Sequence, residues 1–204
     1  YLDNFMNTPG LSDEEVNNRC IYIMRNMMAI WPIWTNTNFH DYLKKLYQLN
    51  LQLPDSNKVH HYFSDVPFSW DGMTKSKYDS IAKRVFPIRD KIMANNIIQR
   101  YETISNSKEK RKKCLVIMNY RHAFNVRDTS NTLLSDNTCT YIFQKYPNKT
   151  ANVLLNSFAY DWKQIPVPIQ NGKWDEAFEV LENPSLGFDF SNSPFGRDNF
   201  DLAI

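Results

Sequence analysis

The chain has 204 residues, of which 42% are hydrophobic, and its 24 basic and 22 acidic residues leave a formal charge of +2. This length and composition can bury a substantial core and exclude a disordered chain. Because the charges nearly balance, the protein has no overall electrostatic field that would attract nucleic acid or an anionic membrane. Because no run of about 18 apolar residues is present, the sequence also predicts no transmembrane segment.

The first predicted helix is defined by its amino-terminal cap. Ser12 and Glu15 have the spacing of a capping box, and apolar residues recur at helical intervals behind them. We therefore predict a helix over Asp13 to Ile30. The chain begins at Tyr1 rather than at a methionine, so we expect one domain over residues 1–204 that lacks an amino-terminal portion.

A second helix and a short strand are predicted next. An apolar stripe indicates a helix from about Asn38 to Leu49. The segment "KVHHYFSDVPFSW" that follows is typical of a strand ending near Asp65. The adjacent residues His60 and His61 would point to opposite faces of that strand, so no metal site is predicted there. Asp65 either binds a substrate at the rim of a sheet or forms a turn.

A third helical region runs from about Lys75, and Pro87 either kinks it or starts a new helix. Its apolar stripe consists of Met93, Ile97, Tyr101 and Ile104. Arg89 lies one turn before Met93 on the same stripe and needs an anionic partner if it is partly buried. Asp90 could supply that partner or simply favour the start of the helix.

The loop "SNSKEKRKK" after this helix is charged but has no interleaved aromatic residues, so it indicates a solvated connector rather than a nucleic-acid site. It leads into a continuous apolar run, Cys114 to Met118, which is typical of a strand covered on both faces. The four residues that follow combine hydrogen-bond donors with an imidazole suited to proton transfer near neutral pH. They are Asn119, Tyr120, Arg121 and His122.

The order of the remaining elements predicts the fold class. A helix from Thr138 to Tyr146 is followed by an apolar segment, "ANVLLN", that resembles another buried strand. The alternation then continues with "KWDEAFEVL" as a helix and "LGFDF" as a strand. Strand, helix and strand in this order imply a parallel crossover. We therefore predict an α/β fold with a mostly parallel sheet between two layers of helices.

The three cysteines are odd in number, widely spaced and set among apolar residues. This pattern favours buried free thiols over a disulfide framework or a zinc site. The residues are Cys20, Cys114 and Cys139.

Two segments together resemble a known group of α/β proteins. A "RDKIMAN" helix start, a charged loop and an apolar strand ending in "NYRHAF" look like the erythromycin esterase, ChaN and TraB/TIKI group. Members of that group have an Arg-Asp-x-x-Met-Ala-x-Asn helix, followed by a strand that ends in a His-Asn-x-His or Gly-x-x-His motif. The earlier "YLKKLYQLN" and "VHHYFSD" also resemble a helix and a strand of that family. The resemblance covers roughly residues 34–157.

The resemblance carries over to only a few positions. Arg89 and Asp90 match the Arg-Asp pair, and His122 matches the last histidine of the second motif. Asn119 stands where the family has histidine or glycine. The family's remaining histidine and glutamates lie nearer the amino terminus, so the resemblance implies that the stretch from Pro87 to Phe124 is the second half of a two-part site.

The first hypothesis is therefore an esterase-like hydrolase acting on an ester or a similar bond of a small molecule. In it, His122 activates water or a hydroxyl, and Arg89 and Arg121 stabilise an oxyanion or bind a carboxylate. Asp90 orients one of these groups. Asn119, Tyr120 and Asp65 are the candidate substrate contacts, and no metal ligands are assigned.

The alternatives follow from other members of the group. A non-catalytic ChaN-like protein would bind haem or iron through His122 or Tyr120, so haem and a divalent metal are the cofactors left open. A degenerate scaffold is the third alternative, which the replacement at Asn119 favours. The resemblance also favours a bacterial cell envelope or another extracytoplasmic location. The sequence gives no signal for the oligomeric state.

Overall fold

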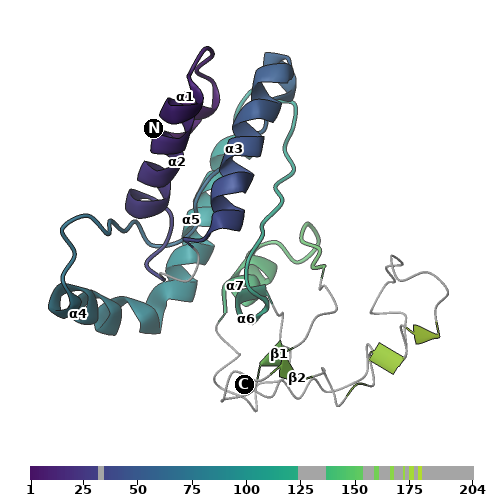
Figure 1. Ribbon diagram of the computed structural model, residues 1–204. Coiled ribbons are helices and arrows are strands. Elements are labelled where there is room, and N and C mark those ends of the chain that lie inside the picture. Colours follow the sequence, from purple (N-terminus) through teal and green to yellow (C-terminus); the bar gives the residue numbers. More distant parts are fainter. Residues whose placement is uncertain are drawn as a thin grey trace. The chain divides into compact units, whose positions relative to one another are not determined.

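The computed structural model describes residues 1–31, 35–123 and 137–153, together with the short stretches 159–160, 166–167, 172, 175–176 and 179–180. Contacts along the chain define two compact units, Tyr1–Asn152 and Val153–Ile204. All helices named below belong to the first unit (Figure 1). The candidate site lies in this helical unit.

Three helices at the amino terminus share one hydrophobic core. They are α1 (Leu2–Met6), α2 (Asp13–Asn26) and α3 (Thr37–Gln52). The Ser12 side chain accepts a hydrogen bond from the Glu15 backbone, and the Glu15 carboxylate accepts one from the Ser12 backbone, so the predicted capping box is confirmed. The apolar faces of the three helices bury the following residues: Leu2, Phe5, Met6, Val16, Cys20, Ile23, Leu43, Leu46 and Tyr47.

The ends of these helices differ slightly from the predictions. Helix α2 ends at Asn26 rather than at Ile30, although Ile30 is fully buried in a second cluster with Phe68 and Val85. Helix α3 begins at Thr37, where the Asn36 side chain accepts a hydrogen bond from the backbone of Phe39. A short 3₁₀ turn, η2 (Asp55–Asn57), follows it.

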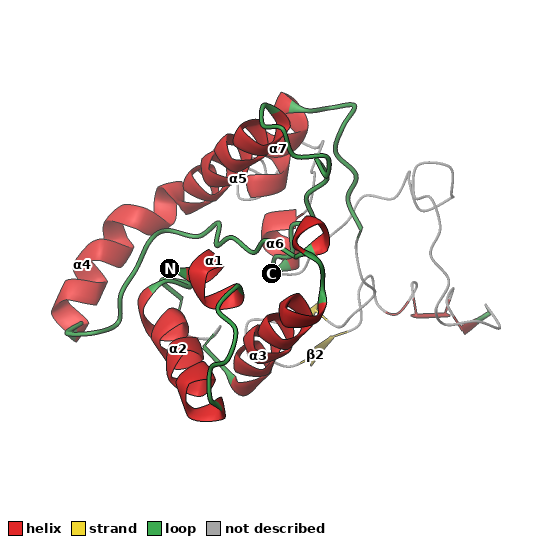
Figure 2. Ribbon diagram, turned by 90° about the horizontal axis from the view of Figure 1, so that it is seen from above, coloured by secondary structure: helices red, strands yellow, loops and turns green. Residues whose placement is uncertain are grey.

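Two helices and a 3₁₀ turn follow one another without a break. Helix α4 spans Lys75–Val85, η3 spans Phe86–Ile88 and α5 spans Arg89–Ser105 (Figure 2). Pro87 lies in the first turn of η3, where the missing N–H of proline costs no helical hydrogen bond. The helix therefore restarts after Pro87, and Arg89 and Asp90 become the first two residues of α5.

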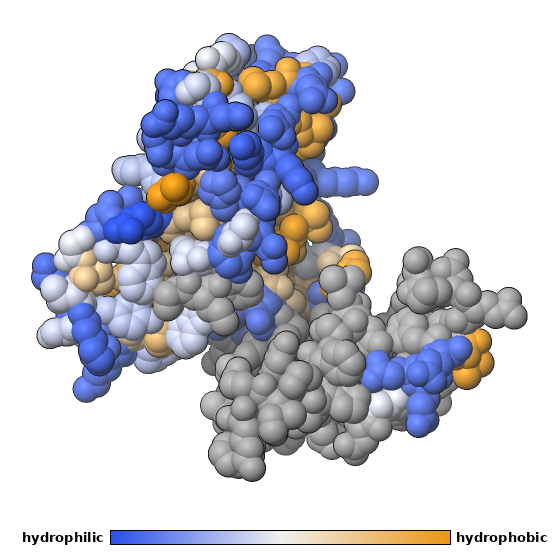
Figure 3. Space-filling model, viewed as in Figure 1, coloured by the Kyte–Doolittle hydropathy of each residue, from blue (hydrophilic) through white to orange (hydrophobic). Residues whose placement is uncertain are grey.

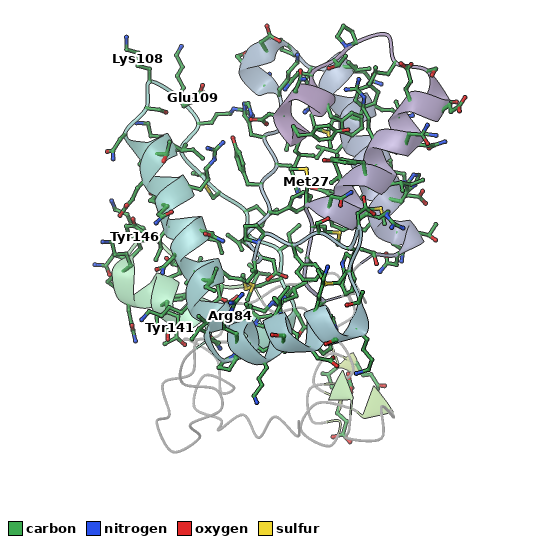
Figure 4. The ribbon with its side chains drawn as sticks, turned by 90° about the vertical axis from the view of Figure 1, so that its left-hand side faces the viewer. Met27, Arg84, Lys108, Glu109, Tyr141 and Tyr146 are labelled. Atoms are coloured by element: carbon green, nitrogen blue, oxygen red, sulfur yellow. The ribbon has the colours of Figure 1, made fainter. Side chains whose placement is uncertain are left out.

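The last two helices are short. Helix α6 (Tyr120–Ala123) is a single turn, and α7 (Thr138–Lys145) packs against α5. At this contact the rings of Tyr101 and Tyr146 lie 5.1 Å apart, and the Tyr146 hydroxyl donates a hydrogen bond of 3.1 Å to Glu102. Figure 4 shows Tyr141 on α7 and Tyr146 just beyond its carboxyl end, both beside α5, and Lys108 and Glu109 in the loop beyond the end of α5.

The predicted α/β fold is wrong. The described residues contain two strands, β1 (Ala159–Tyr160) and β2 (Pro166–Val167), each of two residues. They pair antiparallel, with Ala159 opposite Val167, and both belong to the second unit. The other regular elements of the described residues are helices, so this part of the chain has neither a parallel sheet nor the crossover and three layers that such a sheet would require.

The strand predicted before Asp65 is an irregular segment held by side chains. The buried amide of Asn50 donates to the carbonyl of Val59 and accepts from its N–H, at 2.9 and 2.8 Å. The Arg111 guanidinium donates to the carbonyls of Asn57 and Lys58. These side chains satisfy the backbone groups that a neighbouring strand would otherwise satisfy. The alternation of side chains in the sequence does not distinguish a strand paired with a neighbouring strand from an irregular segment held by side chains.

The strand predicted at Cys114 to Met118 is also wrong. These residues have no strand partner among the described residues, and Leu115 and Ile117 are 86% and 80% exposed. A continuous apolar run indicates that burial would be favourable, but it does not determine whether other segments pack against it. Cys114 is therefore exposed, contrary to the prediction, whereas Cys20 and Cys139 are buried free thiols as predicted.

The remaining predictions lie mostly beyond the described ranges. In the predicted strand "ANVLLN", residues 151–153 form no strand and Val153 is 81% exposed, while residues 154–156 lie outside the description. Most of "KWDEAFEVL", all of "LGFDF" and Pro32 also lie outside it.

The surface of the described part combines charged and hydrophobic side chains (Figure 3). Within these residues, no helix has both the length and the apolar character needed to cross a bilayer.

Candidate functional site

The start of α5 directs two successive side chains to different parts of the first unit. Arg89 and Asp90 are adjacent, and adjacent residues of an α-helix are separated by about 100° around its axis. Arg89 reaches the segment around Asp65, whereas Asp90 reaches His122 and Thr138. Four candidate residues from the sequence analysis therefore form two pairs at the start of α5. The pairs are Arg89 with Asp65 and Asp90 with His122.

The first pair is a bidentate ion pair between Arg89 and Asp65. Nε of Arg89 lies 2.8 Å from one carboxylate oxygen and Nη2 lies 2.7 Å from the other. The side chains are 13% and 10% exposed, so water screens the pair weakly. Asn96, two turns along α5, donates a hydrogen bond of 2.9 Å to the carbonyl of Ser64. The ion pair and this hydrogen bond together hold the segment before α4 against one face of α5.

The second pair is centred on one oxygen of the Asp90 carboxylate. Oδ1 of Asp90 lies 2.8 Å from Nδ1 of His122. The same oxygen accepts a hydrogen bond of 2.8 Å from the backbone N–H of Thr138 and one of 2.7 Å from its hydroxyl. Thr138 is the first residue of α7 and is fully buried. Asp90 therefore satisfies an N–H that the helix itself leaves unpaired, at a helix end where negative charge is favourable.

These hydrogen bonds set the charge of Asp90. Burial is the largest single influence and raises the pKa of the carboxyl, but the hydrogen bonds from His122 and Thr138 and the charge of His122 together outweigh it. The pKa of Asp90 is consequently below its ordinary value, and the group is a carboxylate at neutral pH.

An ionised Asp90 determines which nitrogen of His122 carries the proton. A carboxylate only accepts hydrogen bonds, so Nδ1 of His122 must be the donor in the 2.8 Å contact. The neutral imidazole then keeps its lone pair on Nε2, which makes no hydrogen bond within the described part of the chain. The side chain of His122 is 21% exposed, so water can reach this nitrogen.

A shallow groove borders the other end of the site, at Asp65. It has a volume of about 390 Å³, and its walls include His61, Tyr62 and Phe63. The Tyr42 hydroxyl lies 2.8 Å from Nδ1 of His61, and burial lowers the pKa of His61. His61 is therefore neutral at neutral pH and contributes an aromatic surface to the groove.

The other predicted site residues lie in or next to α6. The backbone N–H of His122 donates a hydrogen bond of 3.0 Å to the carbonyl of Asn119, which positions the turn. Tyr120 and Arg121 are the first two residues of α6, and their side chains lie outside the description. Asn119, Tyr120 and Arg121 therefore share the backbone turn that carries His122.

Sequence reasoning did not identify Thr138 or Asn96 as part of the site. Thr138 had a local signal, since Asn137 is a typical amino-terminal cap and its side chain accepts from the Thr140 N–H. That signal predicts the helix start, but not the carboxylate that binds its first N–H. Asn96 lies seven residues after Arg89, a spacing that places both on one face of a helix.

The described residues contain no cluster of three or more histidine, cysteine, aspartate or glutamate side chains that could hold a metal ion. Comparison of the chain with protein-family models, curated proteins and solved structures gives no match.

Proposed function

We propose that this protein is a hydrolase in which His122, held by Asp90, activates water for attack on an ester or a similar bond of a small molecule. The observation that carries the proposal is the 2.8 Å contact between Nδ1 of His122 and Oδ1 of Asp90. An imidazole oriented in this way presents Nε2 to a reactant and can act as a general base. The helical fold removes the architecture that the family resemblance implied, so the proposal rests on this geometry.

The electrostatics of the pair support a proton-transfer role. When Nε2 takes a proton from water, His122 becomes a cation next to the Asp90 carboxylate. The negative charge of Asp90 stabilises that cation, and the two hydrogen bonds from Thr138 keep the carboxylate in place and ionised. The Asp90 side chain is 28% exposed, so solvent only partly screens this interaction.

The two arginines have different roles in this proposal. Asp65 binds Nε and Nη2 along one edge of the Arg89 guanidinium, so we assign Arg89 to positioning the start of α5 rather than to binding an oxyanion. Arg121 directly precedes His122 in α6 and remains the candidate for stabilising an oxyanion or binding a carboxylate. Asn119 and Tyr120 are the candidate substrate contacts from the same turn.

The test is hydrolysis of a series of p-nitrophenyl esters by the wild-type chain and by His122→Gln. We expect the wild type to hydrolyse at least one ester and His122→Gln to lose about 100-fold or more in rate, which is typical for removal of a general base. His60→Gln is the matched control, because His60 also faces a carboxylate, that of Asp3, but at 3.4 Å and 44% exposed. The proposal fails if the wild type is inactive on the whole series or if His122→Gln retains full activity.

The same geometry favours a second candidate, a haem-binding protein. A metal-bound histidine commonly donates its other ring N–H to a carboxylate, and Asp90 occupies that position at His122. His122 would then be the residue that binds the haem iron, through Nε2. Titration with micromolar haem should shift and sharpen its Soret band, a change that His122→Gln should remove and His60→Gln should keep. No spectral change with the wild type would exclude this candidate.

A further inference from the structure

Residues 110–118, between α5 and α6, form an extended loop (Figure 2). Residues 110–118 make no hydrogen bond to another backbone group within the described part of the chain. The segment carries consecutive apolar side chains, of which Leu115, Val116 and Ile117 are 86%, 40% and 80% exposed. Apolar side chains beside unpaired N–H and C=O groups are the features of an exposed sheet edge, which pairs readily with another strand.

We propose that this segment is the interface of a symmetric dimer, in which the segments of two copies pair as antiparallel strands centred on Val116. Such an interface uses the same surface of both copies, as a two-fold axis requires.

Side-chain matching favours a second copy as the occupant. In this register, Leu115 of one copy lies opposite Ile117 of the other, on the same face of the two-stranded ribbon. These are the two most exposed apolar side chains of the segment. Direct cross-strand pairs of this kind bring the Cβ atoms to about 4.5–5.5 Å, so each copy covers the apolar side chains of the other.

The charges next to the segment favour the antiparallel arrangement. Lys112 and Lys113 precede the apolar run, and Asn119 and Tyr120 follow it. Antiparallel pairing places Lys113 of one copy opposite the uncharged Asn119 of the other, and the pairing ends there because Tyr120 begins α6. Parallel pairing in register would place lysine opposite lysine, which is unfavourable.

The beginning of the segment is anchored to the helical unit. The Arg111 guanidinium donates to the carbonyl of Asn57 at 3.1 Å, and Nζ of Lys112 donates to the carbonyl of Ser105 at 2.6 Å. A partner strand would therefore pair with a segment whose beginning is held in place by the helical unit. Because a short two-stranded ribbon is only marginally stable, we expect a weak dimer that dissociates on dilution.

The first experiment is sedimentation velocity over a wide range of protein concentrations. The wild type should shift from monomer to dimer as concentration rises, and Ile117→Lys should remain monomeric with an unchanged circular dichroism spectrum. Ile21→Lys is the matched control, since Ile21 is also exposed, at 49%, but lies on α2. A wild type that is monomeric throughout, or dimerisation by Ile117→Lys, would overturn the proposal.

The second experiment tests the register in a Cys114→Ser background. Val116 faces its own copy across the two-fold axis at a Cα separation of about 4.5–5.5 Å, which suits a disulfide. Val116→Cys should therefore form a disulfide-linked dimer, whereas Leu115→Cys should not, because the two Leu115 positions are offset by two residues. Equal cross-linking of both variants would contradict the register. Protection of amides 114–118 from hydrogen exchange in the dilute monomer would show that another segment of the same chain covers them, and would also overturn the proposal.

Discussion

Asp90 and His122 are 32 residues apart in sequence, yet Oδ1 of Asp90 lies 2.8 Å from Nδ1 of His122. The contact joins the start of α5 to the single turn of α6. Thr138 joins α7 to the same oxygen. One carboxylate therefore links three helices, and it also fixes the ring nitrogen that His122 leaves available for chemistry.

The first prediction concerns the pH dependence of stability. The folded-state pKa of Asp90 lies below its ordinary value near 3.8, so its stabilising effect is present above that value and is lost as pH falls through the folded-state pKa. Thr138→Val removes one donor to the carboxylate and should raise the pKa of Asp90. The free energy of unfolding should drop by about 1.5–3 kcal/mol at pH 7, as for a hydrogen bond to a charged group, and by progressively less in acid.

Urea unfolding at neutral and acidic pH measures this difference. Thr140→Val is the matched control, because its hydroxyl donates 3.1 Å to the neutral side chain of Asn137. The cost of that substitution should not depend on pH. An equal pH dependence for both variants would show that Thr138 does not act through Asp90.

The second prediction concerns the ion pair between Arg89 and Asp65. Asp65→Asn leaves the poorly exposed guanidinium without its anion and should lower the free energy of unfolding by about 3–5 kcal/mol. Chemical denaturation measures the loss. Asp71→Asn, which breaks the Arg25 pair with side chains 58% and 54% exposed, should cost far less. Similar losses in the two variants would contradict the buried character of the Arg89 pair.

The third prediction concerns the cap of α2. Ser12→Ala removes the side-chain acceptor for the Glu15 N–H and should destabilise the fold by about 1 kcal/mol. Ser12→Thr keeps a hydroxyl and should retain most of the stability. Thermal unfolding of both variants provides the comparison. A full loss with threonine would mean that contacts other than the cap dominate at this position.

The fourth prediction concerns thiol reactivity. Cys114 is exposed, whereas Cys20 and Cys139 are buried and burial raises the pKa of both thiols to about 11. Because the thiolate is the reactive form, iodoacetamide should modify Cys114 first in dilute native protein. Peptide mass spectrometry gives the order of labelling. Labelling of Cys139 as fast as that of Cys114 would contradict the described burial.

Helices α2, α3, α4, α5 and α7 could be predicted because their signals are local, whereas the short helices α1 and α6 were not predicted. The capping box of Ser12 and Glu15 and the position of Pro87 each specify a helix boundary within a few residues of sequence. The strands could not be predicted in this way. The run from Cys114 to Met118 has the composition of a buried strand, but whether it pairs depends on which distant segments lie beside it.

The candidate site was predictable in part for the same reason. The sequence placed Arg89, Asp90 and His122 in one set of candidates, and the structure brings Asp90 and His122 into contact. It pairs Arg89 with Asp65 instead, and it adds Thr138 to Asp90. Those two partners depend on how α5 packs against the segment before α4 and against α7, and no local pattern encodes that packing.

The most direct test of the proposed role of His122 is its protonation state by NMR. Long-range ¹H–¹⁵N correlation spectra of histidine-labelled protein near pH 8 should show His122 with its proton on Nδ1 and a free Nε2, and Asp90→Asn should change this pattern while leaving His60 unaltered. A proton on Nε2 of His122 in the wild type, or identical spectra for the wild type and Asp90→Asn, would contradict the assignment of His122 as a base held by Asp90.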